Sequence, residues 1–172
     1  MLEQLRTRRS VRSYTEQKID SDSIAAFKEV LLRSPSSRRI NPWEFIFVEE
    51  REMLSSLAGC KMHGSAFLSG AALGIVICAD ETKSDVWVED CSIAAILLQM
   101  EAQNRGLGSC WIQIRNRQQS ESVTSENYVR QLLSIPSHIR VDSIISIGHP
   151  AESHDPVPEE KLQREKIHVG KW

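Results

Sequence analysis

The fold of this chain depends above all on one stretch, Val86–Trp111, which reads VWVEDCSIAAILLQMEAQNRGLGSCW. Its middle part, Ile93–Leu98, is apolar on every side of a helix, and such a helix is buried all round, in a large core or against a second subunit. From Trp87 to Arg105 the helix would be about 28 Å long, roughly the width of a small domain. We therefore expect a long central helix that crosses the molecule. Covering its apolar surface needs more packing partners than one small chain easily provides.

Both ends of this helix carry recognisable signals. Glu89 and Asp90 stand near its start and Arg105 at its end, which matches the helix dipole. Gly106 is placed to end the helix in a left-handed cap, and Gly108 allows another backbone segment to approach closely.

Length and composition favour one globular domain over residues 1–172. Of these residues 41% are apolar, and the formal net charge of -2 gives no reason to expect a nucleic acid or a membrane surface as partner. No apolar run approaches the ~18 residues that span a bilayer, and the N-terminal sequence MLEQLRTRRS has no apolar signal core. We expect a soluble, cytoplasmic protein.

The cysteines do not indicate a metal site. Cys78, Cys91 and Cys110 stand in apolar surroundings, where a free cysteine behaves as a small hydrophobic residue. Cys60 and His63 have ligand-like spacing, but there is no second pair to complete a site.

Strands and helices alternate along the chain, but without strict βαβ regularity. The pattern predicts an α+β fold, with helices around one mixed or mostly antiparallel sheet. Besides the central helix, we expect strands at 44–48, 72–79, 109–114 and 141–148, and helices at 2–8, 21–33, 51–57 and 128–133. The tail 151–172 is too short for a core, and its apolar end is expected to pack on a neighbouring subunit.

The segment Arg8–Tyr14 collects three arginines and two serines just after the first helix. Arginine suits phosphate because its planar fork donates two parallel hydrogen bonds, and serine hydroxyls and turn amides can complete such a site. Taken alone, however, the segment favours a solvated basic surface.

The loop Ser34–Trp43 holds two prolines, three serines, an asparagine and two arginines, and leads straight into a strand. Small hydroxylated residues beside a rigid Pro-Trp corner suit a flat heteroaromatic ligand, which needs polar edge contacts and an apolar wall. The alternative is a surface connection that Trp43 anchors to the core.

Four pieces of sequence occur in an order that resembles the short form of the FMN-dependent nitroreductase family. They are Arg8–Arg12, then Pro35–Ser37 with Asn41–Trp43, then Gly106–Ile112, and last Ile147–Pro150 before the tail. The resemblance covers nearly the whole chain, and the ordered set is more specific than any one piece.

This resemblance implies an α+β homodimer with the long central helix in its interface and two FMN molecules in clefts between the subunits. It also implies a two-step, ping-pong reaction. NADH or NADPH gives hydride to flavin N5 and leaves, and a flat acceptor such as a nitroaromatic or a quinone then enters the same pocket.

The resemblance assigns the residues of the flavin site in four groups. The FMN phosphate is expected at Arg8, Arg9, Ser10 and Arg12, and the partner subunit is expected to line the flavin with Pro35, Ser36, Ser37 and Asn41. The backbone of Gly106, Leu107, Gly108 and Ser109 is expected close by. Of the basic residues in the tail, Lys161 is the first candidate to join the phosphate site and Arg164 the second.

The loop departs from the family pattern at two positions. Members usually have an asparagine, and a glutamine two residues later, before the Pro-Trp pair, where this chain has Arg39 and Asn41. Asn41 can still make amide contacts, with shorter reach, whereas Arg39 adds a cation. The choice between NADH and NADPH and the class of acceptor therefore stay open.

Two other functions compete with the reductase. A protein of the same fold could bind flavin for sensing or handling with little turnover. A nucleic-acid surface could use Arg6–Arg12, Arg38–Arg39 and Arg115–Arg117, but no stacking aromatics are interleaved with these arginines. Because a flavin carries its own chemistry, the lack of a recognisable nucleophile or acid–base pair is compatible with either flavoprotein.

Overall fold

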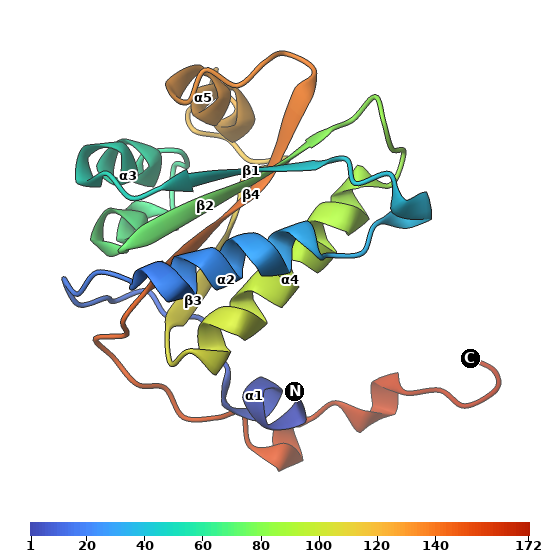
Figure 1. Cartoon of the computed structure of the whole chain (residues 1–172). Coiled ribbons are helices and arrows are strands. Elements are labelled where there is room, and N and C mark those ends of the chain that lie inside the picture. The colour runs from blue at the N-terminus through green and yellow to red at the C-terminus, as the bar shows by residue number, and fades with distance from the viewer.

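A four-stranded sheet forms the middle layer of the computed structural model, which describes all residues from 1 to 172 (Figure 1). Its strands are β1 (Trp43–Val48), β2 (Leu73–Asp80), β3 (Gly108–Gln113) and β4 (Ile139–Gly148), in the order β1-β2-β4-β3. Every neighbouring pair of strands is antiparallel. The predicted α+β fold is confirmed, and its sheet is antiparallel rather than mixed.

Helices cover both faces of the sheet. The α-helices are α1 (Leu2–Thr7), α2 (Ser21–Leu32), α3 (Arg51–Ala58), α4 (Trp87–Asn104) and α5 (Ser125–Leu132), and the 3-10 helices are η1 (Ser37–Arg39), η2 (Ala66–Gly70), η3 (Glu159–Lys161) and η4 (Arg164–Lys166). On β2, Ile75 and Ile77 belong to the core beneath α2 and α4, whereas Val76 and Cys78 belong to the core beneath α3, η2 and α5. Two covered faces explain why this strand is apolar without alternation.

The starts of two helices follow from side-chain caps. The Asp20 carboxylate accepts a hydrogen bond from Ser23 N at 2.8 Å at the start of α2. Thr124 Oγ1 accepts one from Asn127 N at 3.1 Å, so α5 begins at Ser125, three residues before the predicted start. The sequence Asp20-Ser21-Asp22 predicts the first of these caps, whereas the second was missed.

The central helix α4 spans nearly the predicted residues, but one chain does not bury it all round. Ala94, Ala95 and Leu98 are fully buried against the sheet and α2, whereas Ile93 and Ile96 are 39% and 41% exposed. Part of Ile93–Leu98 is therefore left open by a single chain, which agrees with the expectation that this helix needs more cover than one small chain provides. The helix lies on the outside of the sheet layer, so its far face has no cover from the same chain.

The C-terminal end of α4 has the predicted left-handed cap. Gly106 has φ of 70°, its N–H donates to the carbonyl of Gln103, and Leu107 N donates to the carbonyl of Ala102 at 2.9 Å. These are the two hydrogen bonds of a Schellman cap, and the buried Leu107 supplies its usual hydrophobic contact. The cap turns the chain directly into β3.

The tail after β4 passes α1 and then extends away from the body of the molecule (Figure 1). All of its residues from 151 onward are exposed, and Trp172 at its end is 100% exposed. Near its end, the tail contacts itself through stacking of the His168 and Trp172 rings, whose centroids are 4.2 Å apart. No helix of the chain is long and apolar enough to cross a membrane.

Candidate functional site

The arginine-serine segment lies beside the start of β3. Ser10 forms a parallel bridge with Ser109, and Val11 N donates to the Ser109 carbonyl at 3.0 Å. A Cβ added to Gly108 would stand 2.7 Å from the Cβ of Val11, so only glycine permits this approach. The structure thus brings together two predicted parts of the flavin site, Arg8–Arg12 and Gly106–Ser109, that are far apart in the sequence.

The four predicted phosphate ligands are divided between two sides of this segment. Successive side chains of an extended segment point to opposite sides. Arg9 donates a hydrogen bond to the Asp155 carbonyl in the tail. On the other side, the Arg12 guanidinium lies over the Phe67 ring, 5.8 Å from its centroid. Arg9 is therefore held by the tail of its own chain, separately from Arg12.

Three cations, Arg8, Arg12 and Lys61, lie near enough to the Cys110 thiol to act on its pKa, and we call them the cationic cluster. Burial raises the pKa of Cys110, and the charges of Arg12, Arg8 and Lys61 act in the opposite direction, as does a hydrogen bond with Ser10. None of the three cations forms an ion pair within the chain. Three cations without an ion pair, close to a serine hydroxyl, fit the phosphate of a nucleotide.

Lys61 was missed by the sequence analysis. Its ammonium folds back over the turn that follows it, 3.9 Å from the position a Cβ would take at Gly64. In the sequence it stands between Cys60 and His63, where the spacing directed attention to a metal site. No local signal connects it to Arg8 or Arg12, because the approach of these segments is a tertiary feature.

The rim of the cationic cluster is formed by the first residues of the tail. Arg12 N donates to the Glu152 carboxylate at 3.0 Å, and this hydrogen bond, together with His154 at 3.2 Å, lowers the pKa of Glu152. A cavity of about 200 Å³ lies on the Arg9 side of the segment and is bounded by residues of 106–108 and 152–154. It is a gap between the tail and the capped end of α4.

The loop Pro35–Trp43 is held at the opposite end of α4. The buried Asp90 carboxylate accepts a hydrogen bond from Ser37 N at 2.8 Å, which ties the loop to the first turn of the helix. Ser36 Oγ lies 2.7 Å from Asn41 Oδ1 and accepts from Asn41 N at 2.9 Å. The predicted flavin ligands Ser36 and Asn41 therefore hold each other and shape the loop.

The backbone of this loop is strained at three positions that are not glycine. Arg38, Arg39 and Asn41 have φ of 53°, 58° and 52°. Such left-handed conformations cost on the order of 1 kcal/mol each and persist only where surrounding contacts determine them. The hydrogen bonds that Asp90 and Ser36 Oγ accept from backbone N–H groups of the loop are contacts of that kind, so the loop has one defined shape.

One chain cannot bring the two parts of the predicted site together. Helix α4 has 18 residues and is about 27 Å long. The cationic cluster lies beyond its C-terminal end and the strained loop at its N-terminal end, as Figure 1 shows for β3 and η1. Pro35, Ser36, Ser37 and Asn41 are therefore remote from Arg8, Arg12 and Gly106–Ser109.

The two basic tail residues do not join the cationic cluster in this chain. Lys161 and Arg164 are both exposed, and Arg164 pairs with Glu159 at 2.6 Å. The tail residues Val157 and Leu162 instead line a cavity of about 690 Å³ with Leu2 and Leu5 of α1.

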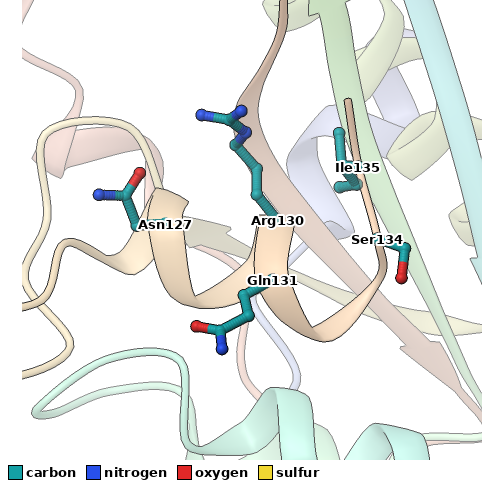
Figure 2. Close-up of a pocket in the computed structure, with 5 residues that line it drawn as sticks. All are labelled: Asn127, Arg130, Gln131, Ser134 and Ile135. Atoms are coloured by element: carbon teal, nitrogen blue, oxygen red, sulfur yellow. The ribbon is translucent and has the colours of Figure 1, made fainter. Parts of the chain in front are cut away.

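Another hollow, of about 440 Å³, lies at the end of α5. Its polar side chains, Asn127, Arg130, Gln131 and Ser134, point in different directions and do not converge on one point (Figure 2). Arg130 is partly engaged with the Pro136 carbonyl at 3.4 Å. None of the predicted site residues lines this hollow.

The cysteines offer no reactive thiolate. All four are buried, and burial raises the pKa of each thiol, that of Cys78 to about 12. This agrees with the expectation that they behave as small hydrophobic residues.

Comparison with known proteins identifies the family. The family model described as "Putative TM nitroreductase" matches residues 1–168. A protein of Archaeoglobus fulgidus named "Putative NADH dehydrogenase/NAD(P)H nitroreductase" is 33% identical over 99% of this chain and 98% of its own length. Among solved structures, an FMN-dependent nitroreductase from Clostridium difficile R20291 is 39% identical, with a TM-score of 0.98 over 100% of both chains.

A further structure, from Parabacteroides distasonis, has a TM-score of 0.89 and 31% identity over 99% of this chain and 98% of its own. It carries the same name as the Archaeoglobus relative. Sequence motifs, fold and relatives agree over the full length, and the chain therefore belongs to the nitroreductase family.

Proposed function

We propose that this protein is an FMN-dependent oxidoreductase that transfers hydride from NADH or NADPH to a nitroaromatic, a quinone or a similar flat acceptor. The observation that carries this proposal is the cationic cluster beside the start of β3, since none of its three side chains forms an ion pair within the chain. The names of the relatives, NAD(P)H nitroreductase and FMN-dependent nitroreductase, support the same cofactors.

The residues at the C-terminal end of α4 would hold the cofactor. Arg8, Arg12 and Lys61 would bind and neutralise the phosphate, with Ser10 donating a hydrogen bond. The backbone at Gly106–Ser109 would border the flavin. When bound, FMN supplies the redox chemistry by taking hydride at N5 from the nicotinamide and passing it, in a ping-pong sequence, to the acceptor.

A homodimer would complete the site. If the exposed Ile93 and Ile96 of two copies pack with their α4 helices antiparallel, the strained loop of one copy comes to the cationic cluster of the other. Ser37 and Pro35 would then line a flavin held mainly by the second chain. The same pairing covers the apolar face of α4 that one chain leaves open.

The rest of the chain has a place in this arrangement. Residues 1–172 form one FMN-binding domain, and the tail 151–172 packs on the partner, since Ile167, Val169 and Trp172 contact little of their own chain. Lys161 or Arg164 reaches a phosphate only if the tail closes over it. The cytoplasmic location expected from the sequence stays a prediction.

An absorbance spectrum of the purified protein during nicotinamide titration tests the function. We expect a yellow protein whose flavin absorbance bleaches with NADH or NADPH and returns when a nitroaromatic or quinone is added. A colourless protein that does not take up FMN would contradict the proposal. Bound FMN that neither nicotinamide bleaches would instead favour the flavin-binding sensor.

A further inference from the structure

The two arginines of the strained loop differ in what they contact. Arg38 donates from Nη2 to the Asp85 carboxylate at 2.8 Å. Arg39, the next residue, is exposed and makes no hydrogen bond or ion pair with its side chain. One cation of the pair is therefore ion-paired, and the other is free.

Several other polar groups of the loop are already occupied. Ser37 N donates to Asp90, and Ser36 Oγ hydrogen-bonds both Oδ1 and N of Asn41. The guanidinium of Arg39 is thus the one charged group of the loop that is available to a bound molecule. Its five N–H donors suit a carboxylate or a phosphate.

The backbone determines the direction in which Arg39 leaves the loop. Arg38 and Arg39 both have left-handed φ angles, which asparagine and glycine adopt at lower cost than arginine. Because Asp90 and Ser36 restrain the loop on either side of these residues, the Cα–Cβ bond of Arg39 has one orientation. The loop therefore presents a free cation from a rigid base, which lowers the entropic cost of binding an anion.

We propose that Arg39 selects reactants that carry an oxyanion, either a carboxylate on the electron acceptor or the additional phosphate of NADPH. The inference rests on the proposed function, because the strained loop reaches the flavin pocket only in the dimer described above. It assigns Arg39 a role in specificity and none in holding FMN.

Binding measurements on the FMN-loaded full-length protein test this role without turnover. Two matched pairs of probes differ mainly in charge at one position, benzoate against benzamide and NADP⁺ against NAD⁺, and the flavin difference spectrum reports the Kd of each. In Arg39→Gln we expect the member with the additional oxyanion, benzoate or NADP⁺, to bind about tenfold more weakly in at least one pair, as for one lost charge-assisted hydrogen bond. The other member of that pair, benzamide or NAD⁺, should change less than twofold.

The pattern of losses identifies the source of the anion. A loss confined to benzoate assigns Arg39 to the acceptor, and a loss confined to NADP⁺ assigns it to the nicotinamide nucleotide. The wild-type preference for the anionic probe should also decrease as KCl is raised, because salt screens exposed charges. The control Arg38→Gln removes the neighbouring, paired cation and should keep the wild-type preference.

Three results would overturn the inference. They are unchanged selectivity in Arg39→Gln, the same loss in Arg38→Gln, and a shift of Arg39→Gln to monomer in size-exclusion chromatography, which would assign Arg39 to the subunit interface. Failure of the proposed function is recognised separately, because the wild-type protein would then bind no FMN.

Discussion

The two ends of α4 each carry part of the candidate site, but they are constructed differently. At the C-terminal end, a Schellman cap at Gly106 and the contact of Val11 with Gly108 form the scaffold, and the charges above it are unpaired. At the N-terminal end, the buried Asp90 and the Ser36–Asn41 contacts hold a strained loop in which one charge of two is paired.

This difference indicates that the two ends of α4 have different roles. A scaffold of backbone contacts leaves the arginine side chains free for a ligand with a large fixed charge. A loop whose polar groups mostly hydrogen-bond within the chain has few groups free for a ligand. In the proposed dimer it would present a defined surface to a second copy. We therefore expect changes at the C-terminal end to affect cofactor affinity, and changes at the N-terminal end to affect stability and selectivity.

The largest effect is expected between the two ends, where Ile96 lies on the open face of α4. Ile96→Glu would place a carboxylate in the proposed interface, and leaving it unpaired there should cost about 3 kcal/mol or more, roughly a hundredfold in dimer dissociation. Light scattering after size-exclusion chromatography should show a monomer that has also lost FMN. Ile96→Val is the control, and a monomeric Ile96→Glu that retains FMN tightly would refute the two-subunit site.

At the C-terminal end, two glycines should respond unequally to substitution. Gly108→Val would collide with Val11 and displace the arginine-serine segment, at a cost of about 3 kcal/mol in the free energy of unfolding and with loss of FMN. Gly106→Ala has open space around it and should cost only about 1 kcal/mol for its left-handed φ. Denaturant unfolding measures both, and equal costs would contradict the described packing.

The cationic cluster should determine affinity for the phosphate. Arg8→Ala and Arg12→Ala should each weaken FMN binding by roughly tenfold to a hundredfold, since each loses a charge-assisted bond of about 1.5–3 kcal/mol. Lys61→Met should have an effect in the same direction. Fluorescence titration of the FMN-free protein measures each Kd.

Two controls make this test specific. Riboflavin lacks the phosphate, so its weaker binding should be changed little by any of these substitutions. Arg9→Ala should weaken FMN binding least, because Arg9 is held by the Asp155 carbonyl. If Arg9→Ala has the largest effect, the assignment of the phosphate to the Arg12 side of the segment is wrong.

A smaller effect is expected at the N-terminal end. Asp90→Ala removes the acceptor for Ser37 N, and the unsatisfied N–H should cost about 1–2 kcal/mol of stability. Asp90→Asn keeps an acceptor oxygen and should recover most of this loss. Thermal unfolding compares the two, while FMN affinity should change less than in Arg12→Ala. Equal losses of stability in both variants would show that the charge of Asp90, rather than its hydrogen bond, holds the loop.

Much of the fold could be read from local sequence. Asp20 as a helix cap, Gly106 with its left-handed φ and the apolar run of β2 each depend on a few neighbouring residues. The order of the four motifs also predicted the family that the relatives confirm. These features are local because capping, turn geometry and strand propensity depend on backbone preferences within a few positions.

Only the tertiary structure decided how these pieces form a site. Pairing of Ser10 with Ser109 determines which side Arg9 faces and which side Arg12 faces, because moving the register by one residue would exchange them. The position of Lys61 near Cys110 depends on a turn from another part of the chain, and the open face at Ile96 depends on which side of α4 the sheet covers. Contacts between distant segments follow from packing of the whole chain, and for this reason neither the role of Lys61 nor the contacts of Arg9 and Arg12 could be recognised from spacing alone.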